Sequence, residues 1–244
     1  MESAKLERNL KKLSKIEELS GVKILHSLKS FNQNSVLPQI ASNLAGMSIS
    51  SLKELEIAQK AKSKYLHLYA PAYKSHELLT MLDAVSSISF NSLTQWERFS
   101  TIDSKTSMGL RINPRLHLPI PDYCNPNLDY SRLGVEYLEF IETYKKNSNN
   151  FKNLEGLHFH ALFQSSVEGI ITLLEHIEKE YQAILPQLKW LNLGGGHNFT
   201  DDSYDLDSFL KIIKNFQNSY PHIQLYFEPG ESVVKGCVIL SLQS

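Results

Sequence analysis

A lysine follows the first apolar run of the chain and could act as a nucleophile. The run at residues 22–31 is bounded by Gly21 and the polar Asn32, and Lys29 stands near its end. In a parallel α/β fold, the carboxyl ends of the strands face the active site. An amine held there is half desolvated and becomes a usable nucleophile toward an aldehyde, such as that of pyridoxal phosphate. The alternative is a lysine that simply leaves the sheet for solvent.

Further groups with useful chemistry follow later apolar runs, namely Arg111, His158, His160 and Glu228. His158 and His160 share a face because side chains alternate along a strand. An unpaired carboxylate at Glu228 would be costly in a buried position. Beside a pyridine nitrogen it would keep the ring protonated, and a protonated ring is the electron sink that decarboxylation requires. The alternatives are a structural ion pair for Glu228 or Arg111, and an ordinary core histidine for His160.

Glycines follow the last two of these runs, at residues 194–196 and at Gly230. Glycine lets backbone N–H groups approach phosphate oxygens closely, and the loops after the last two strands of a barrel often hold a phosphate. A flexible turn is the alternative for the three consecutive glycines. Their position after an apolar strand favours a phosphate site.

Bulk properties exclude several classes of function. The 244 residues carry a net charge of −1, which gives no support for nucleic-acid or acidic-membrane partners. No apolar run is long enough to span a bilayer, and the N-terminus predicts a charged helix rather than a signal peptide. Cys124 and Cys237 fit a reducing cytoplasm, and their spacing rules out a cysteine-based zinc site. We therefore predict a cytoplasmic protein without a metal site.

Strands and helices are predicted to alternate, which indicates an α/β fold of the (β/α)₈ barrel type. A doubly wound open sheet is the alternative, but no Gly-x-Gly-x-x-Gly opens the first helix. A long Pro- and Asn-rich loop at 115–130 is expected to be functional. The strands are expected at 22–31, 46–50, 65–70, 84–90, 108–112, 154–162, 189–193 and 224–228, with helices at 3–19, 34–45, 51–61, 76–82, 94–100, 135–144, 167–185 and 206–220.

Six short stretches resemble the alanine-racemase-like, fold-type III pyridoxal-phosphate decarboxylases, and most closely their carboxynorspermidine/carboxyspermidine decarboxylase branch. They run in family order across nearly the whole chain. The stretches are Leu-Lys-Ser-Phe at 28–31, Met-Gly-Leu-Arg-Ile-Asn-Pro at 108–114, Tyr-Ser-Arg-Leu-Gly-Val at 130–135, Leu-His-Phe-His at 157–160, Leu-Gly-Gly-Gly-His at 193–197 and Phe-Glu-Pro-Gly-Glu at 227–231.

The resemblance implies a role for each matching residue. Lys29 would bond the cofactor covalently, His160 would stack on its ring, Glu228 would face the pyridine nitrogen and Arg111 would lie near the ring hydroxyl. The phosphate loop would comprise Gly195, Gly196 and Gly230. Substrate contacts would come from His197, Glu231 and Arg132.

Two local departures from the family pattern concern the cofactor site. Glu231 stands where related ornithine and diaminopimelate decarboxylases have an arginine that helps to bind phosphate. Ala161, Leu162 and Phe163 follow the stacking histidine where those relatives carry a serine, and Ser165 is the nearest substitute.

Length is the largest departure. Family members carry a second, β-rich domain that completes the site of the other subunit in a homodimer. Here we expect a barrel at 1–232 and only the start of that domain at 233–244, beginning as a strand at 233–242. The chain would thus be a truncated family member. In an inactive fragment, Val233, Val234, Val238 and Ile239 would be exposed and promote aggregation.

The predicted function is pyridoxal-phosphate-dependent decarboxylation of carboxynorspermidine or carboxyspermidine to norspermidine or spermidine, in polyamine biosynthesis. One alternative is a single-domain protein that binds pyridoxal phosphate for cofactor homeostasis. Glu228 argues against it, since a carrier needs no acid at the ring nitrogen. The other alternative is an inactive fragment of the decarboxylase.

Overall fold

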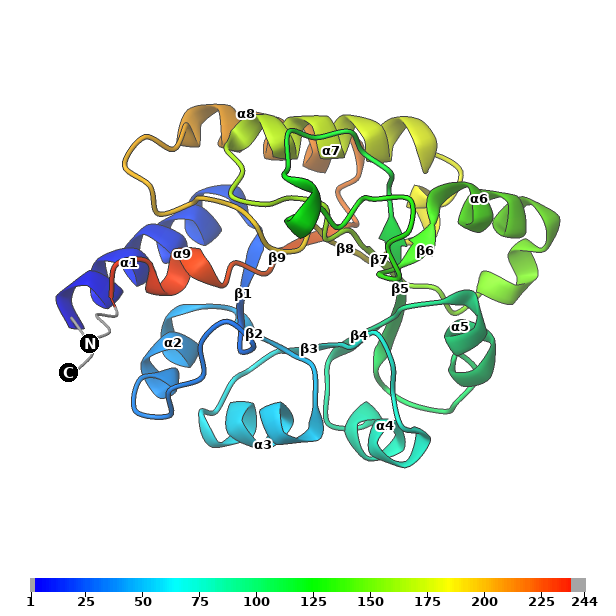
Figure 1. The fold of residues 1–244 in the computed structure, drawn as a ribbon, viewed down its shortest axis with the longest axis horizontal. Coiled ribbons are helices and arrows are strands. Elements are labelled where there is room, and N and C mark those ends of the chain that lie inside the picture. Colours follow the sequence, from blue (N-terminus) through cyan, green and yellow to red (C-terminus); the bar gives the residue numbers. More distant parts are fainter. Residues whose placement is uncertain (1–2, 238–244) are drawn as a thin grey trace.

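A closed ring of parallel strands forms the centre of the computed structural model, which describes residues 3–237 (Figure 1). In these residues eight strands pair in the order β1-β2-β3-β4-β5-β7-β8-β9, and β9 pairs again with β1. The predicted (β/α)₈ barrel is confirmed. The ring strands are β1 (Lys23–Ser27), β2 (Gly46–Ile49), β3 (Leu66–Tyr69), β4 (Ser87–Phe90), β5 (Ser107–Asn113), β7 (Gly156–His158), β8 (Trp190–Asn192) and β9 (Gln224–Phe227).

Helices surround the ring and bury one apolar face each, as the spacing of their hydrophobic residues predicts. In α1 this face consists of Leu6, Leu10, Leu13 and Ile16. The helices are α1 (Ser3–Ser20), α2 (Leu37–Asn43), α3 (Leu52–Lys60), α4 (Ser75–Leu82), α5 (Leu93–Phe99), α6 (Tyr137–Lys146), α7 (Val167–Glu180), α8 (Leu206–Ser219) and α9 (Glu231–Val234), with 3₁₀ turns at Asp122–Cys124, Ser148–Phe151 and Leu185–Gln187.

One large side chain fills the inside of the barrel between β5, β7 and β8. The Trp190 ring is buried, and its Nε1 donates to Ser107 Oγ at 2.8 Å. Gly109 and Gly156 face this ring, and a Cβ on either would lie 2.4 or 2.0 Å from its atoms. Two glycines on neighbouring strands therefore make room for the tryptophan.

Several predicted boundaries were wrong for identifiable reasons. The strand predicted at 22–31 ends at Ser27, because a turn closed by Ser30 Oγ donating to Ser27 O at 2.6 Å follows it. Residues 135–136 form a short strand, β6 (Val135–Glu136), and the Glu136 side chain caps α6. The long helix predicted at 167–185 ends at Glu180, because the backbone leaves the helical conformation at Tyr181, and a 3₁₀ turn follows at Leu185–Gln187.

The segment after β9 is helical where a strand was predicted. Val233 and Val234 lie in α9, and Val233 is fully buried, so the predicted exposure of Val233 was wrong. The rest of the predicted strand, including Val238 and Ile239, lies outside the described residues. In the described part of the chain, no helix combines the length and apolar character needed to cross a bilayer.

A buried asparagine ties this last helix to the first one. Asn9 of α1 is 1% exposed, and its Nδ2 donates to Val233 O at 3.2 Å and to Lys235 O at 3.0 Å. The two helices consequently lie side by side (Figure 1).

We expect Asn9→Ala to lower the free energy of unfolding by about 1–3 kcal/mol, because it leaves two carbonyls without their buried donor. Urea unfolding measures the change. Asn43→Ala, which removes an exposed asparagine at the end of α2, is the control and should change stability by less than about 0.5 kcal/mol. Equal effects of the two substitutions would contradict the structural role of Asn9.

Candidate active site

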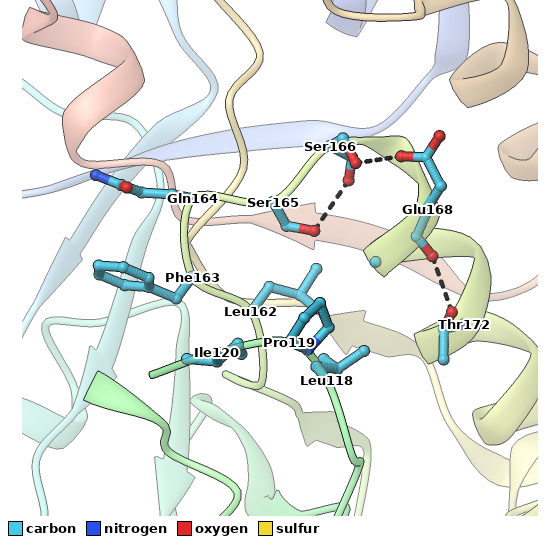
Figure 2. A pocket seen from close by; sticks show the side chains of 11 residues that line it. Leu118, Pro119, Ile120, Leu162, Phe163, Gln164, Ser165, Ser166, Glu168 and Thr172 are labelled. Carbon is cyan, nitrogen blue, oxygen red and sulfur yellow. Dashed lines mark hydrogen bonds between the residues drawn. The ribbon is translucent and has the colours of Figure 1, made fainter. Parts of the chain in front are cut away.

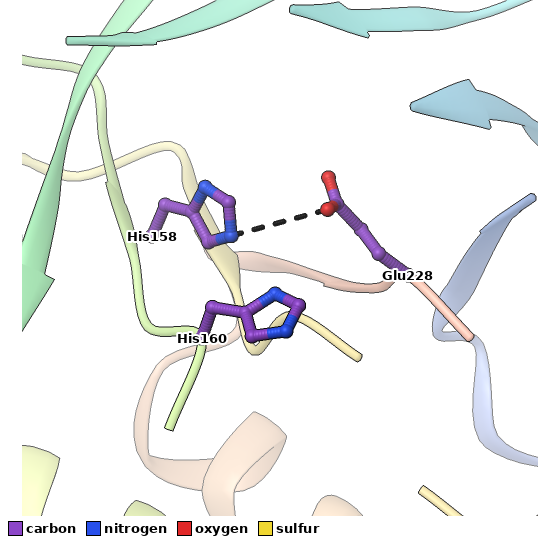
Figure 3. A group of neighbouring side chains, drawn as sticks. All are labelled: His158, His160 and Glu228. Carbon is purple, nitrogen blue, oxygen red and sulfur yellow. Dashed lines mark ion pairs between the residues drawn. The ribbon is translucent and has the colours of Figure 1, made fainter. Parts of the chain in front are cut away.

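A buried carboxylate lies at the carboxyl end of the barrel, directly after β9. Glu228 is 3% exposed, and Asn192 Nδ2 donates to its Oε1 at 2.7 Å. The Nε2 atoms of His67 and His158 lie 3.9 Å from Oε1 and Oε2, respectively. Figure 3 shows Glu228 pointing toward His158 and His160. The carboxylate is thus held by polar groups from three strands rather than by a structural ion pair with lysine or arginine.

Two histidines from the end of β7 face this carboxylate. His158 is fully buried and His160 half-buried. Desolvation lowers the pKa of both well below the usual value, and the positive charges of Arg111 and Lys29 lower it further. Both rings are therefore neutral near pH 7. The backbone N–H of Gly195 donates to His160 Nδ1 at 3.4 Å, which helps to fix that ring.

Arg111 is buried at the end of β5 with an unused donor. Its guanidinium lies over the ring of Tyr69, 4.6 Å from the centroid. Its Nε is buried and has no hydrogen-bond partner within residues 3–237. Tyr69 is fixed in turn because its hydroxyl donates to Asn91 Oδ1 at 2.8 Å. An unused buried donor of this kind is suited to an oxygen of a bound molecule.

Lys29 lies at the same end of the barrel as Glu228. β1 and β9 are neighbours with Ile24 opposite Phe227, so Lys29 and Glu228 follow the carboxyl ends of adjacent parallel strands. The effect of the Lys29 charge on His158 and His160 also places it at this end. The predicted half-burial of Lys29 was wrong: the side chain is exposed, because the strand ends at Ser27 and Lys29 lies in the following turn.

The predicted glycine loops are in direct contact. Glu228 N donates to Gly194 O at 2.7 Å, and a Cβ on Gly195 would lie 2.7 Å from Glu228 O. Gly196 has a φ of +86°, which disfavours any other residue. A Cβ on Gly230 would lie 2.4 Å from Ser30 Oγ, so the Gly230 loop packs against the turn that carries Lys29.

Comparisons with known proteins agree with this arrangement. The model of a family described as "Pyridoxal-dependent decarboxylase, pyridoxal binding domain" matches residues 3–235. The chain belongs to this family.

Curated relatives carry related names. A carboxynorspermidine/carboxyspermidine decarboxylase from Campylobacter jejuni is 35% identical over 233 residues, covering 96% of this chain and 59% of the relative. A carboxyaminopropylagmatine decarboxylase from Synechocystis is 34% identical over 235 residues, with the same two coverages. The chain thus spans about 59% of the length of these two relatives.

Solved structures of the family share the fold. The crystal structure of carboxynorspermidine decarboxylase from Campylobacter jejuni, complexed with norspermidine, superposes with a TM-score of 0.83 at 33% identity, covering 96% of this chain and 59% of that one. The crystal structure of diaminopimelate decarboxylase from Helicobacter pylori, complexed with L-lysine, superposes with a TM-score of 0.77 at 20% identity. The match covers 93% of this chain and 62% of that one. The latter match concerns the fold alone.

In this family member, the three residues predicted to contact substrate differ in exposure. His197 is 3% exposed, and its ring packs on Phe199 and Phe227 at centroid distances of 5.1 and 4.8 Å. The ring is therefore buried in an aromatic cluster, and its substrate contact stays a prediction. Glu231 and Arg132 are exposed, and Glu231 Oε2 accepts from Gln164 Nε2 at 3.4 Å.

Sequence reasoning missed three residues at this decarboxylase-type site: His67 and Tyr69 on β3 and Asn192 on β8. The signal was available, because His67 and Tyr69 alternate on one strand as His158 and His160 do around the end of β7. Both lie on the face that points into the barrel. They were missed because no role was predicted for side chains of the strand at 65–70.

His158, His160 and Glu228 could also act together as metal ligands. Their ligand atoms all lie within 4.8 Å of one another. Two imidazoles and a carboxylate at this spacing are also compatible with a metal ion. The absence of a metal site therefore stays a prediction.

A separate cavity of about 230 Å³ lies between α7 and two loops (Figure 2). None of the residues around Glu228 lines it. Its one charged side chain, Glu168, is exposed and accepts from Ser166 Oγ. This cavity is thus distinct from the site on the barrel axis. Its lining comprises Leu118, Pro119, Ile120, Leu162, Phe163, Gln164, Ser165, Ser166, Glu168, Gly169 and Thr172.

Proposed function

We propose that this chain binds pyridoxal phosphate at the carboxyl end of its barrel and decarboxylates carboxynorspermidine or carboxyspermidine to norspermidine or spermidine. The observation that carries the proposal is the buried Glu228 carboxylate, which lies at the same end of the barrel as Lys29 and is held by neutral side chains. A carrier of the cofactor has no need of such an acid.

The residues present fit the cofactor. The unused Arg111 Nε suits the ring hydroxyl, and the glycine backbone at 195, 196 and 230 suits the phosphate, since side chains there would collide with neighbouring atoms. His160, neutral and half-buried, suits the face of the ring. When bound, pyridoxal phosphate supplies an electron sink for decarboxylation.

Each residue then has a defined task. The Lys29 amine would hold the cofactor at its aldehyde group, in place of the aldehyde oxygen, which leaves as water. The ionised Glu228 carboxylate would accept a hydrogen bond from the protonated pyridine nitrogen. His160 packs on the ring and limits its tilt. Arg111 fixes the hydroxyl side of the ring.

The polyamine substrate class rests on relatives at 31–35% identity. Glu231 is an exposed carboxylate next to Gly230 and is suited to a protonated amine of the substrate, whereas Arg132 is suited to a carboxylate. We further propose that the active form is a homodimer in the cytoplasm, without nucleic-acid or membrane partners.

The test is a titration of the purified chain with pyridoxal phosphate, followed by measurement of carbon dioxide release from carboxynorspermidine and from carboxyspermidine. We expect binding with a visible absorption band, and release that depends on Glu228. Glu228→Gln should retain the fold and lower the release by at least about a hundredfold, the scale of losing one acid–base group. Binding without any release would favour a cofactor carrier or an inactive fragment and contradict the proposed activity.

A further inference from the structure

A second histidine inside the barrel faces the carboxylate that the proposed function assigns to the ring nitrogen. His67 on β3 is 1% exposed, and its Nε2 lies 3.9 Å from Glu228 Oε1. Two serines of β4 hold the ring: Ser87 Oγ lies 2.7 Å from Nδ1 and Ser89 Oγ lies 3.0 Å from Nε2. Among the imidazoles near Glu228, this one is therefore held through both nitrogens.

The contacts of His67 continue toward the opposite end of the barrel. Tyr65, just before β3, has its hydroxyl 2.7 Å from Ser87 Oγ and donates to it. The Tyr65 ring stacks on Tyr226 at a centroid distance of 4.9 Å. Both tyrosines line a cavity of about 340 Å³ together with Lys23, which begins β1. A series of hydrogen-bonded side chains thus runs from Tyr65 at the amino end of the barrel, through Ser87, to the His67 imidazole beside Glu228.

The hydrogen bonds from Tyr65 to Ser87 and from Ser87 to His67 indicate which nitrogen of His67 carries the proton. Since Ser87 Oγ accepts from Tyr65, its own proton is available for His67 Nδ1. A neutral imidazole that accepts at Nδ1 carries its hydrogen on Nε2, the nitrogen next to Ser89 and Glu228 Oε1. Nε2 lies within hydrogen-bond distance of Ser89 Oγ, at 3.0 Å, and 3.9 Å from Glu228 Oε1, which its N–H therefore reaches only as a dipole.

The two oxygens of Glu228 then differ. Oε1 faces His67 and receives the hydrogen bond from Asn192, whose orientation is fixed because its Oδ1 accepts from Gly194 N at 2.9 Å. Oε2 lies 3.9 Å from His158 Nε2, and neither ring nitrogen of His158 has a hydrogen-bond partner within residues 3–237. Oε1 is therefore the anchored oxygen, and Oε2 is the one available to a ligand.

We infer that His67 is a positioning residue: held by the serines of β4, its Nε2 side faces Oε1 of Glu228 beside the hydrogen bond from Asn192, and the dipole of its N–H favours the orientation that presents Oε2 to the pyridine nitrogen. This inference rests on the proposed function. The other groups near Glu228 are Arg111, Tyr69 and His160. None of these is held in place as His67 is by the serines of β4.

The experiment compares pyridoxal phosphate with its 1-deaza analogue, in which carbon replaces the ring nitrogen. Equilibrium binding of both compounds is measured without substrate for the wild type, His67→Leu and His67→Gln. We expect His67→Leu to weaken binding of pyridoxal phosphate about tenfold, the size of one buried polar interaction, and to leave binding of the analogue unchanged. His67→Gln, which keeps an N–H donor, should retain part of the wild-type preference for pyridoxal phosphate over the 1-deaza analogue.

His26→Gln is the matched control. His26 is a fully buried strand histidine on β1 whose Nε2 lies 2.8 Å from Phe31 O, away from Glu228. It should lower thermal stability as His67→Gln does, without changing the preference for pyridoxal phosphate. If His67→Leu does not fold, the ¹⁵N shift of labelled pyridoxal phosphate in His67→Gln reports the hydrogen bond to the ring nitrogen directly.

The outcomes separate the two claims. A wild type that binds the two compounds equally would overturn the role of Glu228 and, with it, the inference. A wild-type preference that both His67 variants retain in full would overturn the inference alone. A preference that falls in His67→Leu and in His26→Gln alike would show a general loss of structure and also overturn it.

Discussion

Lys29→Ala is expected to abolish covalent attachment of pyridoxal phosphate and to lower carbon dioxide release by at least about a thousandfold, since the amine that holds the cofactor is lost. The reason is geometric. Lys29 and Glu228 follow adjacent strands, β1 and β9, at one end of the barrel. Borohydride reduction followed by mass spectrometry of the intact chain measures attachment.

Lys23→Ala is the control for this prediction. Lys23 begins the same strand, is also exposed, and lies at the opposite end of the barrel, so attachment should be unchanged. Stoichiometric labelling of the Lys29→Ala chain would show that another amine holds the cofactor. That result would contradict the assignment of Lys29.

Acidification from pH 7 to pH 5 is expected to cost the unloaded protein at least about 4 kcal/mol of unfolding free energy, because burial keeps several histidines neutral. Burial lowers the pKa of His26 to about 4 and that of His197 to about 3. Between these values and about 6.5, the unfolded chain binds more protons than the folded one. The stabilisation is therefore complete above about pH 6.5 and is lost as the pH falls.

Each of these two histidines contributes about 2 kcal/mol to the loss by pH 5. His67, His158 and His160 change stability in the same direction, because burial also lowers their pKa values. Urea unfolding at both pH values measures the effect, and His26→Gln should show a loss smaller by about 2 kcal/mol. Equal stability of the unsubstituted chain at pH 7 and pH 5 would contradict the neutral state of these rings.

The barrel could be predicted because the apolar pattern of each strand and helix lies within one short stretch of the sequence. Buried runs of four or five residues and amphipathic helices such as α1 each carry their own pattern. Element ends could not be predicted as well, because they depend on single contacts. The hydrogen bond from Ser30 to Ser27 ends β1 early, and the bonds from Asn9 hold residues 233–235 as a helix and turn rather than a strand.

The residues of the candidate site could be predicted from the sequence, but the packing around each side chain could not. Lys29, Arg111, His160 and Glu228 meet at one end of the barrel, as the rule for parallel strands requires. Sequence alone did not reveal that His197 would turn into an aromatic cluster, since that depends on Phe199 and Phe227 packing around it. Nor did it reveal that β3 contributes side chains from within the strand.

The most direct test of the account is a crystal structure of the chain after binding of pyridoxal phosphate and reduction with borohydride. We predict a bond from Lys29 Nζ to the cofactor, with the pyridine nitrogen within hydrogen-bond distance of a Glu228 oxygen. A cofactor joined to a different lysine, or a ring nitrogen facing away from Glu228, would contradict the central claim that these two residues share one ring.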